Sequence, residues 1–165
     1  FNKRKVEIIK NFIQDKELFN NIKTTLMGCE FPYYYFDCIS GDHDTTDYFF
    51  GHTLYANHGE KSDFFDKICI PLLDRIQFTY LIRAKINCYT KKPKPIKTGM
   101  HVDFAEKHRV ALFSVNTNNG YTLFENGEKI KSVENQLAIF DGALKHCSVA
   151  QTDTNVRVNI NLNII

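Results

Sequence analysis

Apolar and polar side chains alternate strictly along nine residues near the C-terminus, Val156-Arg157-Val158-Asn159-Ile160-Asn161-Leu162-Asn163-Ile164. Successive residues of a β-strand point to opposite faces of a sheet, so this period of two predicts a strand with one apolar and one polar face. Residues 81–89 repeat the pattern. Ile82, Ala84, Ile86 and Cys88 fall on one side, and Arg83, Lys85, Asn87 and Tyr89 fall on the other. The C-terminal half therefore predicts a β-rich fold.

Further strands are predicted between turn signals at 110–115, 121–124 and 136–140. Asn118-Asn119-Gly120, Glu125-Asn126-Gly127 and Asp141-Gly142 supply the turns that separate them. Many short strands after an N-terminal helical part are typical of a β-sandwich or barrel that helices buttress. We therefore expect a mainly β (α+β) class.

The N-terminal half shows other patterns. Residues 5–13 predict a short strand and turn, and Asp15 is a candidate N-cap for a helix with apolar residues at helical spacing up to Leu26. Residues 28–60 are rich in turn formers and are expected to be irregular. A second helix is predicted from Ser62, with a kink at Pro71. We expect one domain over 1–165, with 1–77 as helical and irregular support and 78–165 as a jelly-roll core.

Composition excludes several classes of protein. With 165 residues and 43% hydrophobic residues, the chain can bury a core of its own and is not expected to be disordered. A formal net charge of +2 gives little support for nucleic-acid binding, and no apolar run is long enough to cross a membrane. The 16 lysines, 5 arginines and 15 asparagines suggest an AT-rich genome of microbial or viral origin. Oligomeric state and pathway stay open.

The cysteines bear on the cellular compartment. Five are present, at positions 29, 38, 69, 88 and 147, and no two of them form a CxxC pair. An odd number without such a pair argues against a disulfide framework, so we expect a reducing, cytoplasmic environment. No signal peptide is visible, and a sequence that starts at Phe1 instead of Met leaves open whether a preceding segment was removed.

Candidate metal ligands lie near position 100. In Met100-His101-Val102-Asp103-Phe104 the histidine and the aspartate are two residues apart at an expected strand end, so both side chains can face one ion. His146 follows 43 residues after Asp103, behind the turn at Asp141-Gly142. Two imidazoles and one carboxylate form a facial triad, which leaves coordination positions open on an octahedral iron. An isolated HxD pair also arises by chance, so the pattern needs a further element.

Arg157 is that element. A surface strand with a solvated polar face would explain it as well. However, an arginine fixed on a strand is well shaped for bidentate binding of a carboxylate, and its charge is permanent. Asn159 and Asn161 follow on the same face and are expected to line the mouth of a barrel if Arg157 points inward.

These residues together resemble the 2-oxoglutarate/iron(II) dioxygenase superfamily, particularly its prolyl 4-hydroxylase-like branch. The resemblance lies in His101-x-Asp103, His146 and Arg157 eleven residues further on. It also includes the stretches Asn87-Cys88-Tyr89, Tyr121-Thr122-Leu123-Phe124-Glu125 and Leu137-Ala138-Ile139-Phe140-Asp141-Gly142, and it covers roughly residues 80–165. The family fold is a double-stranded β-helix, a jelly-roll barrel, which agrees with the strands predicted above.

The resemblance implies roles for individual residues. His101, Asp103 and His146 would be the catalytic metal ligands for Fe(II), and Arg157 would pair with the distal carboxylate of the co-substrate 2-oxoglutarate. Tyr89, Tyr121 and Asn159 are the further residues expected in the co-substrate site, where Tyr89 matches a tyrosine that donates its hydroxyl. Ser114 stands where relatives often carry a second such tyrosine. O₂ would be the other co-substrate, and the resemblance allows for ascorbate as a further cofactor.

The reaction implied is oxidative decarboxylation of 2-oxoglutarate coupled to hydroxylation of an unactivated C–H bond. Three hypotheses remain open. The first is a hydroxylase of a protein or peptide, with proline as the target. The second is a dioxygenase of a free amino acid, small metabolite or nucleobase. The third is a non-catalytic jelly-roll binding module that keeps the fold.

Other residues allow two interpretations each. Residues 91–97 (KKPKPIK) form either a basic loop that covers the active site or a solvated connector. His43, Asp44, His52 and His58 could form a second metal site, although scattered surface histidines explain them better. Cys147 is either redox-sensitive or a packing residue.

Overall fold

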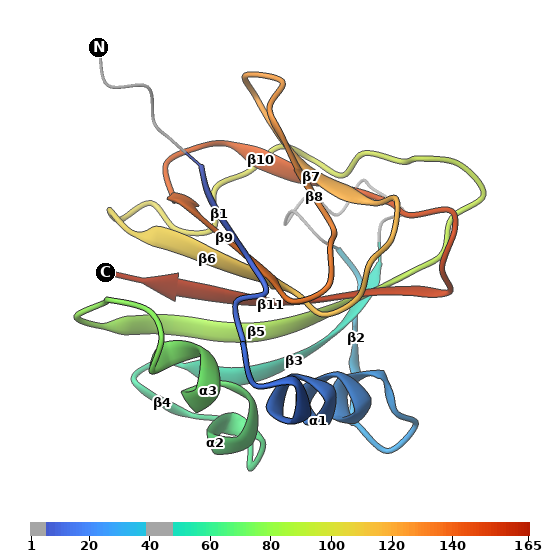
Figure 1. Cartoon of the computed structure of the whole chain (residues 1–165). Coiled ribbons are helices and arrows are strands. Elements are labelled where there is room, and N and C mark those ends of the chain that lie inside the picture. Colours follow the sequence, from blue (N-terminus) through green and yellow to red (C-terminus); the bar gives the residue numbers. More distant parts are fainter. Residues whose placement is uncertain (1–5, 39–47) are drawn as a thin grey trace.

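The structure is a computed structural model that describes residues 6–38 and 48–165. Its strands form two antiparallel sheets, one large and one of three strands. In Figure 1 the large sheet lies in the middle, with β7, β8 and β10 on one side of it and the helices on the other. The expected mainly β class is confirmed.

The strand order brings together segments that are far apart in the sequence. The large sheet runs β1 (Glu7–Lys10), β9 (Gln136–Asp141), β6 (Arg109–Ser114), β11 (Val156–Ile164), β5 (Leu81–Thr90), β3 (Phe49–Ala56) and β2 (Tyr34–Phe36), with β4 (Gly59–Glu60) paired to β3. The small sheet runs β10 (His146–Val149), β7 (Tyr121–Phe124) and β8 (Lys129–Lys131). The alternating strand β11 lies between β6 and β5, inside the large sheet.

The period of two divides the side chains of β11 between two environments. Val158, Ile160 and Leu162 are buried in the main hydrophobic cluster. The helix α1 (Lys16–Met27) covers this face through buried residues that include Ile22 and Leu26. Because the apolar positions supply the packing against the helices, the polar positions of the same strand are left to face the small sheet.

The first helix begins at its predicted cap, whereas the second prediction, one helix from Ser62 with a kink at Pro71, differs from the structure. The Asp15 side chain caps α1 by accepting a hydrogen bond from the Leu18 backbone N–H at 3.1 Å. The predicted second helix is two short helices, α2 (Phe65–Ile68) and α3 (Ile70–Leu73). Pro71 lies in the first turn of α3, where a missing N–H costs no helical hydrogen bond.

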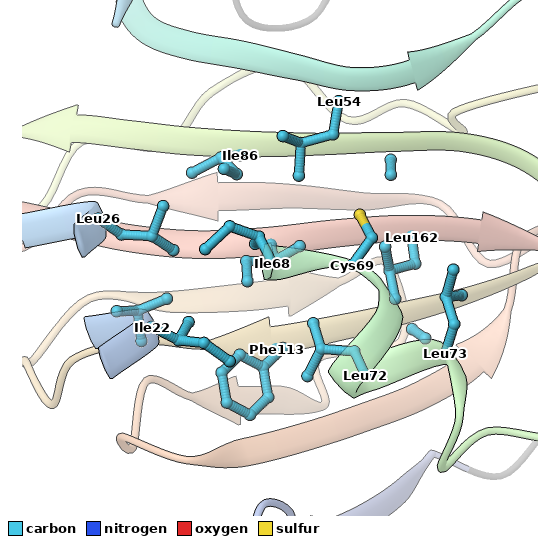
Figure 2. Packing of buried hydrophobic residues seen from close by; sticks show 14 of the residues in the cluster. Ile22, Leu26, Leu54, Ile68, Cys69, Leu72, Leu73, Ile86, Phe113 and Leu162 are labelled. Carbon is cyan, nitrogen blue, oxygen red and sulfur yellow. The ribbon is translucent and has the colours of Figure 1, made fainter. Parts of the chain in front are cut away.

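The side chains of these short helices join the same core. Figure 2 shows Ile68, Leu72 and Leu73 beside Phe113 and Leu162 of the large sheet, and all five are buried in one cluster. None of the helices in the described part of the chain has the length and hydropathy that crossing a bilayer requires.

The expectation that residues 28–60 are irregular is wrong. The eight-residue strand β3 lies inside the large sheet, paired on its two sides with β5 and β2. The sequence hides this strand because Gly51, His52 and Thr53 interrupt its apolar residues, so no period of two is visible. β1 and β3, which both precede residue 77, belong to the large sheet.

Candidate metal centre

The polar faces of β5 and β11 form one wall of a cavity between the two sheets. The cavity has a volume of about 230 Å³ and is open to solvent at one side. The register of the two strands sets four cross-strand pairs on this face, and all of their members except Asn163 line the cavity. The pairs are Tyr89 with Arg157, Asn87 with Asn159, Lys85 with Asn161, and Arg83 with Asn163. Asn159 and Asn161 line this cavity together with Arg157.

His101, Asp103 and His146 meet at one end of this cavity. The Oδ1 atom of Asp103 lies 3.6 Å from His101 Nε2 and 3.7 Å from His146 Nε2. One ligand atom of each residue lies within 4.8 Å of the others, and in the described ranges this is the one cluster of three or more such residues. The convergence that the spacing predicted, across 43 residues of chain, is present in the structure.

The backbone fixes both imidazoles. His101 and His146 form an isolated antiparallel bridge in which each backbone N–H donates to the other residue's carbonyl at 3.0 Å. The Nδ1 of His101 lies 3.0 Å from the Gly99 carbonyl oxygen, and that of His146 lies 2.9 Å from the Leu144 carbonyl oxygen. A carbonyl only accepts, so each Nδ1 carries the proton and each Nε2 has a free lone pair aimed at the cluster.

The Asp103 carboxylate is held by groups that the sequence did not identify. Its Oδ2 accepts hydrogen bonds from Asn161 Nδ2 at 3.0 Å and from Asn163 Nδ2 at 2.7 Å. Arg83 Nη2 lies 3.3 Å from the same oxygen. The Asp103 side chain is 5% exposed, so these three donors orient Oδ2 and leave Oδ1 for an ion.

The protonation states agree with this arrangement. Burial acts to raise the pKa of Asp103, but the contact with His101, the charge of Arg83 and the hydrogen bond from Asn163 hold that pKa below its usual range. Asp103 is therefore ionised at neutral pH. The contact with Asp103 raises the pKa of His101 against the effect of burial, whereas burial lowers the pKa of His146.

This donor set fits a divalent transition metal. Two imidazole nitrogens and one carboxylate oxygen are ligands that iron, zinc and similar ions accept, and three ligands leave coordination positions open. In each of the three side chains the opposite atom makes the hydrogen bonds to neighbouring groups, and among the described residues the three donor atoms contact one another. The residues present therefore fit an iron(II) ion.

Arg157 lies toward the other end of the wall. It is 3% exposed, and its Nη1 donates to Ser148 Oγ at 2.8 Å and to the Val149 carbonyl at 3.3 Å. Its Nη2 donates to Thr122 Oγ1 at 3.3 Å, and its Nε has no hydrogen-bond partner among the residues that the structure describes. All these acceptors are neutral, and none of the acidic residues in the described ranges pairs with Arg157. Burial of this charge lowers the pKa of Arg157.

The structure also locates the other residues expected at the co-substrate site. Tyr89 lines the cavity with its ring 5.5 Å from the Arg157 guanidinium carbon, and burial raises the pKa of Tyr89 to about 12. Asn159 is buried and accepts a hydrogen bond from Asn87 Nδ2 at 3.0 Å.

Tyr121, expected at the co-substrate site, is not among the residues that line the cavity. Its side chain packs with Leu123, Cys147 and Val149, and the neighbouring Thr122 lines the cavity and binds Arg157. Because β7 alternates, one of two adjacent residues must face away, and the sequence did not show which. Thr122 lies on the same face of β7 as Phe124, which is buried in a hydrophobic cluster with residues of β6 and β9.

The remaining candidates have structural explanations. His52 is buried between the Pro32 carbonyl and the Ser62 hydroxyl, which occupy both of its ring nitrogens, and His58 contacts the Tyr80 hydroxyl. His43 and Asp44 lie outside the described residues. Cys147 is buried, and burial raises the pKa of its thiol, which favours the packing role.

The backbone of the 91–97 loop is hydrogen-bonded to the segment that follows β10. Lys91 and Lys92 donate backbone hydrogen bonds to the carbonyls of Asn155 and Gln151, and Ile96 accepts one from Ala150. The lysines at 91, 94 and 97 are exposed. These contacts connect the loop to residues beside Ser148, which binds Arg157.

Solved structures share this fold. An oxidoreductase of the 2OG-Fe(II) oxygenase family from Burkholderia pseudomallei has a TM-score of 0.65 at 10% identity, over 96% of this chain and 84% of that chain. A prolyl hydroxylase from Trichoplax adhaerens, in complex with a hypoxia inducible factor peptide fragment, has a TM-score of 0.64 at 11% identity, over 99% and 84%.

A third neighbour does different chemistry. The alpha-ketoglutarate-dependent epimerase SnoN from nogalamycin biosynthesis has a TM-score of 0.65 at 9% identity, over 98% of this chain and 78% of that chain. No protein-family model matches the sequence, and no curated protein matches it. The structural similarity alone shows that the chain has the fold of 2OG-Fe(II) oxygenases, prolyl hydroxylases among them.

Proposed function

We propose that this chain is a non-haem iron(II) and 2-oxoglutarate-dependent oxygenase of the prolyl 4-hydroxylase-like branch, built on a double-stranded β-helix. One observation carries the proposal. A cluster of two histidines and an aspartate, and a buried arginine without a carboxylate partner among the described residues, face the same cavity between the sheets. The shared fold with 2OG-Fe(II) oxygenases supports it independently.

The metal end has the requirements of an oxygenase site. His101, Asp103 and His146 would hold iron(II), and the bound ion would supply the activation of O₂ that organic side chains cannot. The reaction consumes 2-oxoglutarate, O₂ and a C–H bond, and yields succinate, CO₂ and the corresponding alcohol. Ascorbate is proposed as a reductant that keeps the metal in the iron(II) state.

The arginine end has the requirements of a dicarboxylate site. A buried cation that contacts only neutral acceptors is costly, and a carboxylate would offset that cost. Arg157 would bind the distal carboxylate of 2-oxoglutarate, and the Tyr89 hydroxyl would donate to the same molecule. The cavity wall between Arg157 and Asp103 would orient the co-substrate with its 2-oxo acid end toward the metal.

A protein or peptide, with proline as its target, is the first candidate for the hydroxylated substrate. Its support is the shared fold with a prolyl hydroxylase in complex with a peptide. A free amino acid, small metabolite or nucleobase is the second candidate, supported by the shared fold with an epimerase from a biosynthetic pathway. The two candidates are separated by measuring succinate release in the presence of proline-containing peptides and of metabolites. The class that stimulates release is the substrate class.

The cellular setting is proposed on the cysteines. All five thiols are free in the structure, and three of them are buried. Free thiols are typical of a reducing compartment. We therefore propose that the oxygenase acts inside a cell.

The direct test measures metal binding and co-substrate binding apart from turnover. Calorimetry with Mn(II), which stands in for iron(II) without oxygen chemistry, should show one site, and the Mn(II)-loaded protein should then bind 2-oxoglutarate. His146→Ala should remove the metal site, whereas His58→Ala, a change at an exposed histidine, should leave it intact. Iron(II)-loaded protein should form succinate from 2-oxoglutarate.

Two results would contradict the proposal in different ways. Absence of 2-oxoglutarate binding to the metal-loaded protein would remove the co-substrate assignment. Binding of both without any succinate formation, with every candidate substrate present, would favour the non-catalytic jelly-roll module.

A further inference from the structure

A third cationic side chain, Lys85, lines the cavity beside the metal end. It lies on β5 between Arg83 and Asn87, both of which also line the cavity. Across the sheet it is paired with Asn161, whose amide donates to Asp103. Lys85 is therefore separated from the pair of Arg157 and Tyr89 by the intervening pair of Asn87 and Asn159.

Neighbouring strands hold the Lys85 ammonium in place. Its Nζ lies 3.9 Å from the centroid of the Phe36 ring and 4.4 Å from that of Phe49. A Cβ at Gly51 would approach Lys85 Cε to 3.2 Å and Phe36 Cε2 to 3.1 Å, so the missing side chain makes room for both. The ammonium is thus fixed by two cation–π contacts at a defined point of the cavity wall.

Among the described residues that line the cavity, cationic side chains outnumber carboxylates. Three cationic side chains line the cavity, and the one carboxylate among the described lining residues is Asp103. Asp103 Oδ2 already has Arg83 as its ion-pair partner, and its Oδ1 faces the two imidazoles. No acidic residue in ranges 6–38 and 48–165 forms an ion pair with Lys85. Burial lowers the pKa of Lys85 to about 8, which still leaves the side chain mostly protonated at neutral pH.

We propose that Lys85 determines substrate specificity by binding an anionic group, a carboxylate or a phosphate, that the hydroxylated substrate carries near its reacting C–H bond. The inference rests on the proposed function, since it assigns 2-oxoglutarate to Arg157 and leaves Lys85 for the second organic molecule. A partly buried ammonium beside the metal favours an anion and disfavours a neutral or cationic group at that point.

The test uses the folded protein loaded with Zn(II) and saturated with 2-oxoglutarate, so that Arg157 is occupied. Acetate and inorganic phosphate are the probes, and acetamide is the neutral counterpart of acetate. The Lys85 side-chain NMR signal should shift on titration with at least one anion and not with acetamide. In Lys85→Met the dissociation constant of that anion should rise by about tenfold or more, as expected for loss of a charge-assisted contact.

Matched variants make the result specific. Lys67→Met, at an exposed lysine on α2, should leave anion binding unchanged, and Lys85→Arg should restore most of it. The affinity of the Zn(II)-loaded protein for 2-oxoglutarate should change by no more than about twofold in Lys85→Met, because Arg157 binds the distal carboxylate.

Three results would show that Lys85 does not bind a substrate anion. Anions that bind Lys85→Met as tightly as the unchanged protein, or no anion-dependent shift at Lys85, would overturn the inference. A tenfold loss of 2-oxoglutarate affinity in Lys85→Met would also overturn it, since Lys85 would then belong to the co-substrate site. Failure of the unchanged protein to bind 2-oxoglutarate would instead count against the proposed function.

Discussion

The metal end and the arginine end of the cavity satisfy their charged groups in opposite ways. At the metal end, Arg83, Asn161 and Asn163 surround the carboxylate of Asp103, and the atoms left free are electron-pair donors. At the arginine end, the hydrogen-bond acceptors of Arg157 in the described part of the chain are neutral hydroxyl and carbonyl oxygens. The first end is complete except for a cation, and the second is complete except for an anion.

The two ends also differ in backbone structure. His101 and Asp103 lie outside the regular strands and depend on one isolated bridge and on side chains of β11 for their positions. Arg157 and Tyr89 lie on long strands in the large sheet. Ligands on loops therefore need supporting hydrogen bonds, whereas a cation on a strand is positioned by the sheet itself.

Replacement of Arg157 by Met should have the largest effect and should separate the two ends. The dissociation constant of 2-oxoglutarate should rise roughly 100-fold, about 3 kcal/mol, because a buried charge pair loses one partner. The metal-free protein should be as stable as the unchanged protein or more stable, because an uncompensated buried cation is removed. Calorimetry measures the first effect and urea unfolding the second.

The matched control for this change is Arg75→Met, at an exposed arginine whose Nη1 donates to the Pro71 carbonyl. It should leave 2-oxoglutarate affinity unaltered. A metal-free Arg157→Met protein that is clearly less stable would show that Arg157 is satisfied by its neutral partners, and the proposed need for an anion would be lost.

Replacement of Asn163 by Ala tests the metal end. The Asn163 amide is fully buried and donates the shorter of the two amide hydrogen bonds to Asp103. Its loss should weaken metal affinity by roughly 10- to 100-fold, as is usual for groups that orient a ligand. Competition titration with Mn(II) measures the change, and Asn155→Ala at an exposed position is the control. Unchanged metal affinity would mean that Asp103 is held without this support.

The pH dependence of metal binding should follow His101. Its folded pKa is raised, so its protonated form stabilises the metal-free protein at pH values below the ordinary histidine pKa, and this contribution is lost as pH rises through the raised value. A metal must displace that proton. Metal affinity should therefore fall by about tenfold for each pH unit below the raised pKa of His101.

His146 should add a second proton only at lower pH, because burial lowers its pKa. Zn(II) competition titrations between about pH 8 and pH 6 give the slope, since the ordinary histidine pKa is about 6.5. A flat profile over this window would be inconsistent with His101 as a ligand.

Replacement of Thr122 by Val should have the smallest effect. The Thr122 hydroxyl accepts one hydrogen bond from Arg157, so its loss should raise the dissociation constant of 2-oxoglutarate about fivefold, near 1 kcal/mol. Tyr121→Phe, one residue away on the opposite face of β7, should leave the affinity of the metal-loaded protein within error. The reverse order of effects would restore Tyr121 to the co-substrate site.

The strands with regular alternation and the residues of the metal cluster could be predicted from the order of residues alone. From Ala84 to Cys88 in β5 and from Val158 to Ile164 in β11 every second side chain is buried in the apolar core, and this alternation is visible in the sequence. At the start of β5 a bulge places Leu81, and not Ile82, in that core. His101, Asp103, His146 and Arg157 were found because their residue types and spacing carry a chemical pattern. Strand β3 was not predicted, because apolar residues lie on both of its faces and such a strand shows no period of two in the sequence.

The groups that support the site could not be predicted from the sequence, because they come together through strand pairing. Three sets of contacts depend on the register between strands that are far apart in the chain. Asn161 and Asn163 donate to Asp103, and Thr122, not Tyr121, accepts from Arg157. Phe36 and Phe49 contact the Lys85 ammonium. A shift of one residue in any pairing would turn each of these side chains to the other face. Local sequence sets the two faces of a strand, but packing between sheets sets which residue each face meets.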